Sequence, residues 1–215
     1  MTKESYIVAS LLGDGYLIFR NKKEYQLAMQ HSVKQEKYLI HKLLLAESLG
    51  YKVNFNYIKP SKSRKYPAIR GNIYLSREEA LYYKHRFYPN HNKITTRHLL
   101  NKLDTQGLAI WYQDDGNLSV YNNPNTTGGP QRRIKLCTHG FTKDENVLIK
   151  NYFNIVWDIK FNVKLDKQKY YYIDCGAIQA NKFFKLVAPY IHNSMLYKID
   201  MKYTICGTRS IPMGW

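Results

Sequence analysis

Two aspartates stand at equivalent places in the sequence, each after an apolar segment and directly before a glycine. Asp14 follows residues 7–13 (IVASLLG), and Asp115 follows residues 108–114 (LAIWYQD). Mg²⁺ is usually held by one or two carboxylates together with water and substrate phosphate. A metal bound in this way suits hydrolysis of a phosphodiester, because it activates water and stabilises the leaving oxygen. One Asp-Gly pair would indicate only a turn, but two in the same setting favour a metal site.

The two apolar segments are expected to be helices that pack side by side. Each is followed by glycine, a common residue at helix ends, and then by the alternation that is typical of a strand. The first segment is apolar or small on every face, as in a helix buried between two layers. Ala9 and Gly13 lie four residues apart on one helix face and allow a close approach. Parallel packing of these helices would bring Asp14 and Asp115 together.

The pattern after each aspartate is also repeated. We expect strands at 16–20 and 25–31, a helix at 34–49, strands at 51–58 and 68–75, and a helix at 77–87. The second set is strands at 117–121 and 132–138, a helix at 142–153, strands at 158–165 and 169–175, and a helix at 177–188. Thr142 and Glu145 have the spacing of a capping box. The predicted fold class is α+β, a duplicated αββαββα arrangement with pseudo-two-fold symmetry and halves at 1–95 and 96–215.

Composition limits the class of partner. The 215 residues include 33 Lys and Arg but only 16 Asp and Glu, which gives a formal charge of +17. This excess favours a polyanion such as DNA or RNA. A membrane partner is not expected, because no run of 18 apolar residues and no basic amphipathic helix occurs. A structural RNA-binding protein, such as a ribosomal protein, is the simpler alternative.

Three cysteines, Cys137, Cys175 and Cys206, are widely spaced and lack a Cys-x-x-Cys pair. They therefore indicate neither a zinc site nor a disulfide framework, and they fit a reducing compartment. The first residues contain no apolar signal core. We expect a cytoplasmic protein, or one that acts in the compartment of a bacterial, phage or organellar genome.

The two motifs and their setting resemble the LAGLIDADG homing endonucleases of the monomeric kind, which carry two motifs in one chain. Residues 108–116 (LAIWYQDDG) are close to that motif, and residues 7–15 are looser but keep the final Asp-Gly. The repeated order of elements also matches, so the resemblance covers almost the whole chain. Ile110 and Gln113 depart from the motif in ways that alter helix packing rather than the ligand set.

The resemblance implies roles for five residues. Asp14 and Asp115 would be the catalytic metal ligands, whereas Asp114 occupies a position that is often small and would be a neighbour. Lys93 and Lys198 would be the catalytic basic residues beside the scissile phosphates. They lie 79 and 83 positions after the two aspartates, and each follows a Pro and a His-Asn pair. The implied cofactor is Mg²⁺, and Mn²⁺ or Ca²⁺ can occupy such a site.

The implied activity is that of a monomeric, site-specific endonuclease that cuts double-stranded DNA at a long asymmetric site and leaves short 3′ overhangs. Two antiparallel sheets would form a saddle over the major groove, where base pairs are distinguishable. The first alternative is an intron RNA maturase on the same fold, with the intron RNA as partner. A DNA-binding regulator without nuclease activity is a further alternative, which the presence of both aspartates disfavours.

Strand alternation predicts which side chains face DNA. Residues expected in the core are Leu17, Phe19, Leu27, Met29, Val53, Phe55, Val163 and Leu165. The opposite parity gives Arg20, Gln26, Gln30, Asn54, Asn56, Arg70 and Asn72 in the first half, and Ser119, Tyr121, Arg133, Lys135, Lys160, Asn162, Lys164, Tyr170 and Tyr172 in the second. A register shift of one residue would invert the assignment for that strand. The basic loop at 59–65, with Lys62, Arg64 and Lys65, is expected to contact phosphates.

Overall fold

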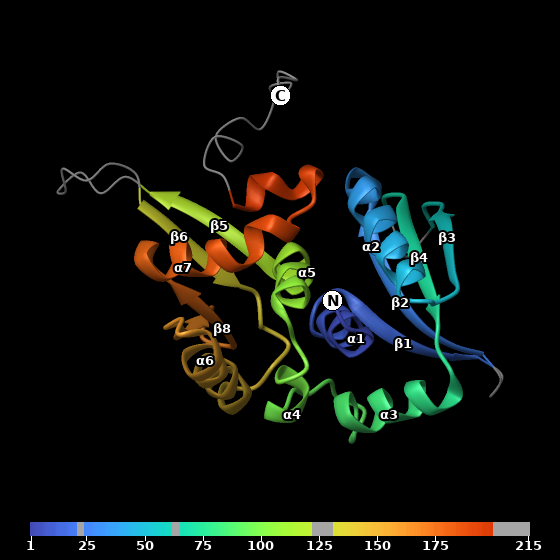
Figure 1. Ribbon diagram of the computed structural model, residues 1–215, viewed down its shortest axis with the longest axis horizontal. Coiled ribbons are helices and arrows are strands. Elements are labelled where there is room, and N and C mark those ends of the chain that lie inside the picture. The colour runs from blue at the N-terminus through green and yellow to red at the C-terminus, as the bar shows by residue number, and fades with distance from the viewer. Residues whose placement is uncertain (21–23, 62–64, 122–130, 200–215) are drawn as a thin grey trace, which may run out of the picture.

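Two four-stranded antiparallel sheets lie on either side of a central pair of helices (Figure 1). The computed structural model describes residues 1–20, 24–61, 65–121 and 131–199. The strand orders are β1-β2-β4-β3 and β5-β6-β8-β7, so the second sheet repeats the topology of the first. The predicted α+β class and its duplication are confirmed.

Each half contains the elements in the predicted order. The first half contains α1 (Lys3–Leu12), β1 (Gly15–Arg20), β2 (Glu24–Ser32), α2 (Glu36–Ser48), β3 (Val53–Ile58), β4 (Ala68–Tyr74) and α3 (Arg77–Phe87). The second contains α5 (Thr105–Asp115), β5 (Gly116–Tyr121), β6 (Gln131–Leu136), α6 (Lys143–Trp157), β7 (Asn162–Asp166), β8 (Tyr170–Cys175) and α7 (Ala177–Val187).

Short helical segments add to this plan at its joints. The helix predicted from residue 34 begins as the 3₁₀ turn η1 (Val33–Gln35), which the Ser32 hydroxyl caps, and continues as α2. The segment between the halves contains α4 (Arg97–Leu100). After α7 come the 3₁₀ turns η2 (Ala188–Tyr190) and η3 (Asn193–Lys198). We keep the division at 95/96 as a proposal, supported by the Thr96 cap that starts α4.

The capping box predicted at residue 142 is confirmed. The Thr142 hydroxyl accepts from the Glu145 amide at 3.3 Å, and the Glu145 carboxylate accepts from the Thr142 amide at 2.8 Å. The second oxygen of Glu145 accepts from the amide of Thr95 at 2.8 Å. This cap therefore also fixes the segment between the two halves against α6.

The core lies between the sheets and the helices. Leu27, Met29 and Ile73 are fully buried on the inner face of the first sheet. On the same face a Cβ at Gly71 would lie 2.9 Å from Leu43, so α2 packs directly on the backbone of β4. A glycine at this place lets the helix approach the sheet closely.

Two residues predicted to lie in the core are exposed. Phe19 is 36% exposed and Leu165 is 50% exposed, although both lie on the strand face that carries the core residues. Each lies in an edge strand, which has a neighbouring strand on one side only. The predicted strand face of Phe19 and Leu165 is therefore correct, and their predicted burial is wrong. The Phe19 ring instead contacts the Lys84 ammonium group, 4.8 Å from the ring centroid.

Candidate active site between the two helix ends

The starts of α1 and α5 are held together by reciprocal caps. Asp104, the N-cap of α5, accepts from the amide of Thr2 at 3.0 Å and from the hydroxyl of Ser5 at 2.8 Å. The Ser5 hydroxyl in turn accepts from the Asp104 amide at 3.0 Å. A Cβ at Gly107 would lie 2.2 Å from that hydroxyl, so only glycine permits this approach. The two helices start at one level and run in parallel.

The other ends of the two helices bring the predicted aspartates into one site. α5 ends at Asp115, and Asp14 follows Gly13, which caps α1. A Cβ at Gly13 would lie 2.5 Å from a carboxylate oxygen of Asp114, so the helix ends also touch. Burial, then the charges of Asp114 and Asp14, raise the pKa of Asp115 from 3.8 to about 7. Burial and Asp114 raise the pKa of Asp14 in the same direction.

The two predicted lysines occupy equivalent positions in the two halves. The Lys93 ammonium donates to the carbonyl of Gly13 at 3.1 Å, and the Lys198 ammonium donates to the carbonyl of Asp114 at 3.1 Å. Each lysine therefore binds the carbonyl directly before a candidate ligand. Burial lowers the pKa of both lysines, and the nearby carboxylates oppose that shift.

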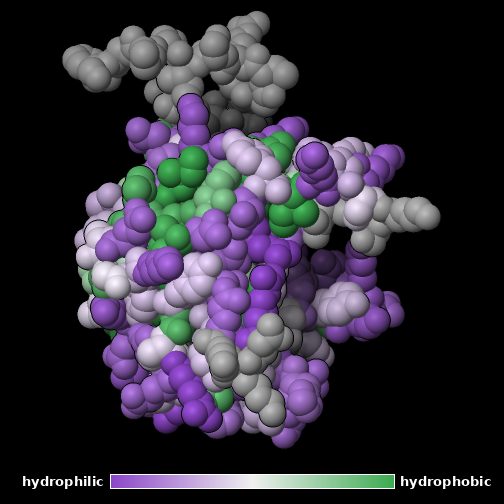
Figure 2. Space-filling view, turned by 90° about the vertical axis from the view of Figure 1, so that its right-hand side faces the viewer, coloured by the Kyte–Doolittle hydropathy of each residue, from purple (hydrophilic) through white to green (hydrophobic). Residues whose placement is uncertain are grey.

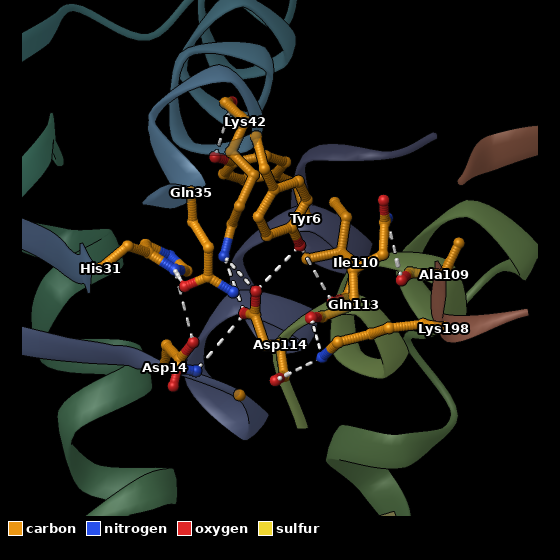
Figure 3. Close-up of polar contacts among 12 residues, drawn as sticks. Tyr6, Asp14, His31, Gln35, Lys42, Ala109, Ile110, Gln113, Asp114 and Lys198 are labelled. Atoms are coloured by element: carbon orange, nitrogen blue, oxygen red, sulfur yellow. Dashed lines mark hydrogen bonds and ion pairs between the residues drawn. The ribbon is translucent and has the colours of Figure 1, made fainter. Parts of the chain in front are cut away.

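Asp114 has partners that the sequence did not reveal. Its carboxylate accepts from the Lys42 ammonium at 2.7 Å and from the Tyr38 hydroxyl at 2.8 Å. The side chains of Lys42 and Asp114 are both fully buried. It also accepts from the backbone amide of Asp14 at 3.3 Å (Figure 3). This buried ion pair joins α2 of the first half to α5 of the second.

His31 lies beside the site, and it is not among the site residues predicted from the sequence. Its Nδ1 lies 3.6 Å from an oxygen of Asp14 and 3.3 Å from the Gln35 amide oxygen (Figure 3). Its Nε2 is buried and has no hydrogen-bond partner among the described residues. Burial lowers its pKa, and the Lys42 charge acts in the same direction. Strand parity, which puts His31 on the inner face with Leu27 and Met29, was the available signal.

Among the described residues, one group of side chains could hold a divalent metal ion, and it includes Asp14 but not the predicted ligand Asp115. Oxygen or nitrogen atoms of Asp14, His31 and Asp114 all lie within 4.8 Å of one another. Of these, Asp114 already accepts from Lys42 and Tyr38 and is enclosed, whereas the Asp14 side chain is 39% exposed. Burial and, after it, the charges of Asp114 and Asp14 raise the pKa of Asp115, and a cation bound nearby would favour its ionised form. The cluster is therefore a candidate divalent-metal site.

The predicted DNA-facing residues of the first half share one face of the first sheet. The register pairs Gln26 with Tyr74, Gln30 with Arg70, and Asn54 with Asn72, away from the face covered by α2. The remaining members, Arg20 and Asn56, have the same parity. Gln26 and Asn72 are only 3% and 7% exposed, so they offer little surface of their own.

The second sheet has the same arrangement. Ser119, Arg133, Lys135, Asn162, Lys164, Tyr170 and Tyr172 share one face, and the backbone of Tyr121 has the same parity. Lys160 precedes β7, so it lies outside the sheet, and its amide donates to Gln179. Lys65 is exposed, whereas Lys62 and Arg64 fall outside the described residues. On the side of the first half seen in Figure 2, hydrophilic side chains predominate.

The described helices include none that is long and apolar enough to cross a membrane.

Comparison with known proteins identifies one family. The model of the LAGLIDADG DNA endonuclease family matches residues 5–183. A probable intron-encoded endonuclease of Wickerhamomyces canadensis is 26% identical over 205 residues, which cover 92% of this chain and 83% of that protein. The RecA protein of Mycobacterium shimoidei is 27% identical over 204 residues, 90% of this chain but 45% of its own length. The chain thus spans about half the length of some curated relatives that it matches.

Solved structures agree with the family match. The homing endonuclease I-WcaI bound to its DNA recognition sequence superposes with a TM-score of 0.72 at 25% identity, covering 92% of this chain and 85% of that one. The double mutant of I-SmaMI superposes with a TM-score of 0.52 at 11% identity, covering 89% and 86%, and supports the fold alone.

Proposed function

Because the chain belongs to the LAGLIDADG DNA endonuclease family, we propose that it cuts both strands of double-stranded DNA at one long asymmetric site. The observation that carries the proposal is the repeated unit at the helix ends. In each half the central helix leads into an aspartate, and a buried lysine binds the carbonyl just before it. Two such units match a reaction that has to be carried out twice, once on each strand.

Asp14 and Asp115 are the residues that would hold the metal in this proposal, and Mg²⁺ is the ion proposed, with Mn²⁺ or Ca²⁺ as substitutes. When bound, the metal supplies activated water and neutralises charge on the phosphate. Lys93 and Lys198 would stabilise negative charge that develops near the scissile phosphates. Each ammonium group donates to the carbonyl that precedes the aspartate of its own half, and the charges of both aspartates act on each lysine.

The open faces of the two sheets are the proposed DNA-binding surface. Basic and amide side chains on these faces suit contacts with phosphates and base edges, and the formal charge of +17 favours a polyanion. Since the two faces differ in sequence, the target would be asymmetric. Both catalytic units lie in one chain, so we propose that a monomer cuts the site and leaves short 3′ overhangs. A DNA substrate would place the protein in a compartment that holds a genome.

The test is selection of a bound site from a randomised double-stranded DNA library, followed by cleavage of that site in Mg²⁺ or Mn²⁺. The wild type is compared with Asp14→Asn, Asp115→Asn and the matched control Asp158→Asn, whose carboxylate is exposed and pairs with Lys182. We expect cutting by the wild type and the control only, with binding by all four. A tightly bound site that is never cut in either metal would refute the nuclease activity and favour the RNA maturase alternative.

A further inference from the structure

An acidic residue lies within the basic, DNA-facing surface of the second sheet. Asp174 shares that face with Lys135 and Asn162, which are its direct neighbours on the adjoining strands. Its side chain is 4% exposed, whereas the Arg133 side chain beside it is 46% exposed. A carboxylate on a surface for a polyanion opposes binding, so its presence requires another role.

The Asp174 carboxylate contacts Arg133 rather than the lysine opposite. The register pairs Asp174 with Lys135, yet an Asp174 oxygen forms an ion pair with Nε of Arg133 at 3.2 Å. Lys135 lies instead over the ring of Tyr172, with its ammonium group 3.8 Å from the ring centroid and 3.8 Å from an Asp166 oxygen. Arg133 therefore reaches diagonally across β6 and β8 to a fixed, buried acceptor.

This contact fixes the direction in which the guanidinium group points. The ion pair is made at Nε, and the second Asp174 oxygen accepts no hydrogen bond from the terminal nitrogens Nη1 and Nη2. These two nitrogens form the fork that matches O6 and N7 of guanine in the major groove. An arginine oriented before binding loses less side-chain freedom when the contact forms.

We infer that Asp174 is a positioning residue that presents Arg133 to a guanine in the half-site bound by the second sheet. This rests on the proposed function, because it needs a specific DNA target. The other oxygen of Asp174 is buried without a hydrogen-bond partner among the described residues. A carboxylate that served only the fold would be expected to have both oxygens satisfied.

The experiment measures binding to every single-base variant of the selected target. It uses the Asp14→Asn background, so that binding is read without cutting. The variants are Arg133→Ala, Arg133→Lys, Asp174→Asn and Asp174→Glu. Asp166→Asn is the matched control, because Asp166 lies on the same face and neighbours a lysine but is 39% exposed.

We expect one G·C pair to be preferred about tenfold to a hundredfold over other pairs, and both Arg133 variants to remove that preference. Asp174→Asn is expected to reduce it about threefold to tenfold at the same position only. Asp174→Glu, which keeps the charge but moves it, should do the same. Asp166→Asn should change affinity equally at all positions. Thermal melting of each variant checks that the fold is retained.

Equal weakening at every position in the Asp174 variants would overturn the inference, and so would an unchanged preference in Arg133→Ala. Failure to select any site from the library would instead refute the proposed function. A selected site that is cut normally but shows no position dependent on Arg133 would refute this inference alone.

Discussion

Replacing Asp115 by asparagine should stabilise the metal-free protein at neutral pH and above, although it removes a proposed ligand. In the folded protein, burial and the charges of Asp114 and Asp14 raise the pKa of Asp115 from 3.8 to about 7. In the unfolded chain the same carboxyl group ionises near its ordinary pKa. Folding therefore opposes ionisation of Asp115, and this opposition is an energetic cost of the site.

The size and the pH window of that cost follow from the two pKa values. Well below pH 3.8 the group is protonated in both states, so it costs nothing. As the pH rises towards 7 the unfolded state releases its proton first, and stability falls. Above pH 7 the loss is constant at about 4 kcal/mol, the equivalent of about three pKa units. Asparagine keeps the shape of the side chain and carries no charge, so it avoids this loss.

The assay is urea or thermal unfolding in a chelator from pH 4 to pH 9, with Asp158→Asn as the control. Asp115→Asn should exceed the wild type by up to about 4 kcal/mol at pH 8, and the difference should close towards pH 4. The control replaces an exposed carboxylate and should differ by less than about 1 kcal/mol. Added Mg²⁺ should stabilise the wild type in a concentration-dependent way but not the variant.

Either of two results would refute this reasoning. Parallel pH profiles for the wild type and Asp115→Asn would mean that folding does not raise the pKa of Asp115. A variant that is less stable than the wild type at pH 8 would mean that the charge of Asp115 stabilises the fold.

Three further predictions concern the surroundings of the ligands. Lys42→Met and Asp114→Ala should each cost about 3–5 kcal/mol in urea unfolding, because each leaves a buried charge unpaired, whereas the double variant should recover most of that loss. Gly13→Ala should cost about 1–3 kcal/mol, because its Cβ would lie 2.5 Å from an Asp114 oxygen, and wild-type stability would contradict the close helix contact. Lys93→Met and Lys198→Met should each slow the cutting of mainly one DNA strand, by about 10²–10³-fold. A DNA substrate with a separate end label on each strand would show this. Equal slowing of both strands would contradict the assignment of one lysine to each half.

The repeated elements could be predicted because their signals are local. An apolar segment before Asp-Gly, and strand alternation after it, occur twice in the sequence and indicate the same arrangement each time. Strand parity likewise assigned the predicted side chains to a shared sheet face in each half. Parity did not predict burial at strand ends, because it assigns the face of a residue and not the extent of packing along an edge strand. Phe19 and Leu165 lie near the ends of edge strands and are exposed.

The contacts that complete the site could not be predicted, because they join distant parts of the chain. Lys42 and Asp114 are 72 residues apart and meet only once the two halves pack together. From the sequence, Lys42 is one of 33 basic residues and looks like any surface lysine. His31 has the parity of a core residue, and its approach to Asp14 depends on how β2 lies beside the end of α1.

The junction between the helix ends shows what a duplicated chain can build. Gly13 and Asp114 hold equivalent positions, directly before the two candidate ligands, and they face each other in contact. The Asp114 carboxylate fits only because its counterpart has no Cβ, and its charge is matched by Lys42 from one half only. A symmetric dimer repeats every residue, so it would have to place two glycines or two aspartates here. Two glycines would leave Lys42 buried without its partner, and two aspartates would clash and repel. Joining the halves in one chain allows each to supply what the other lacks, and it makes the surroundings of Asp14 and Asp115 unequal.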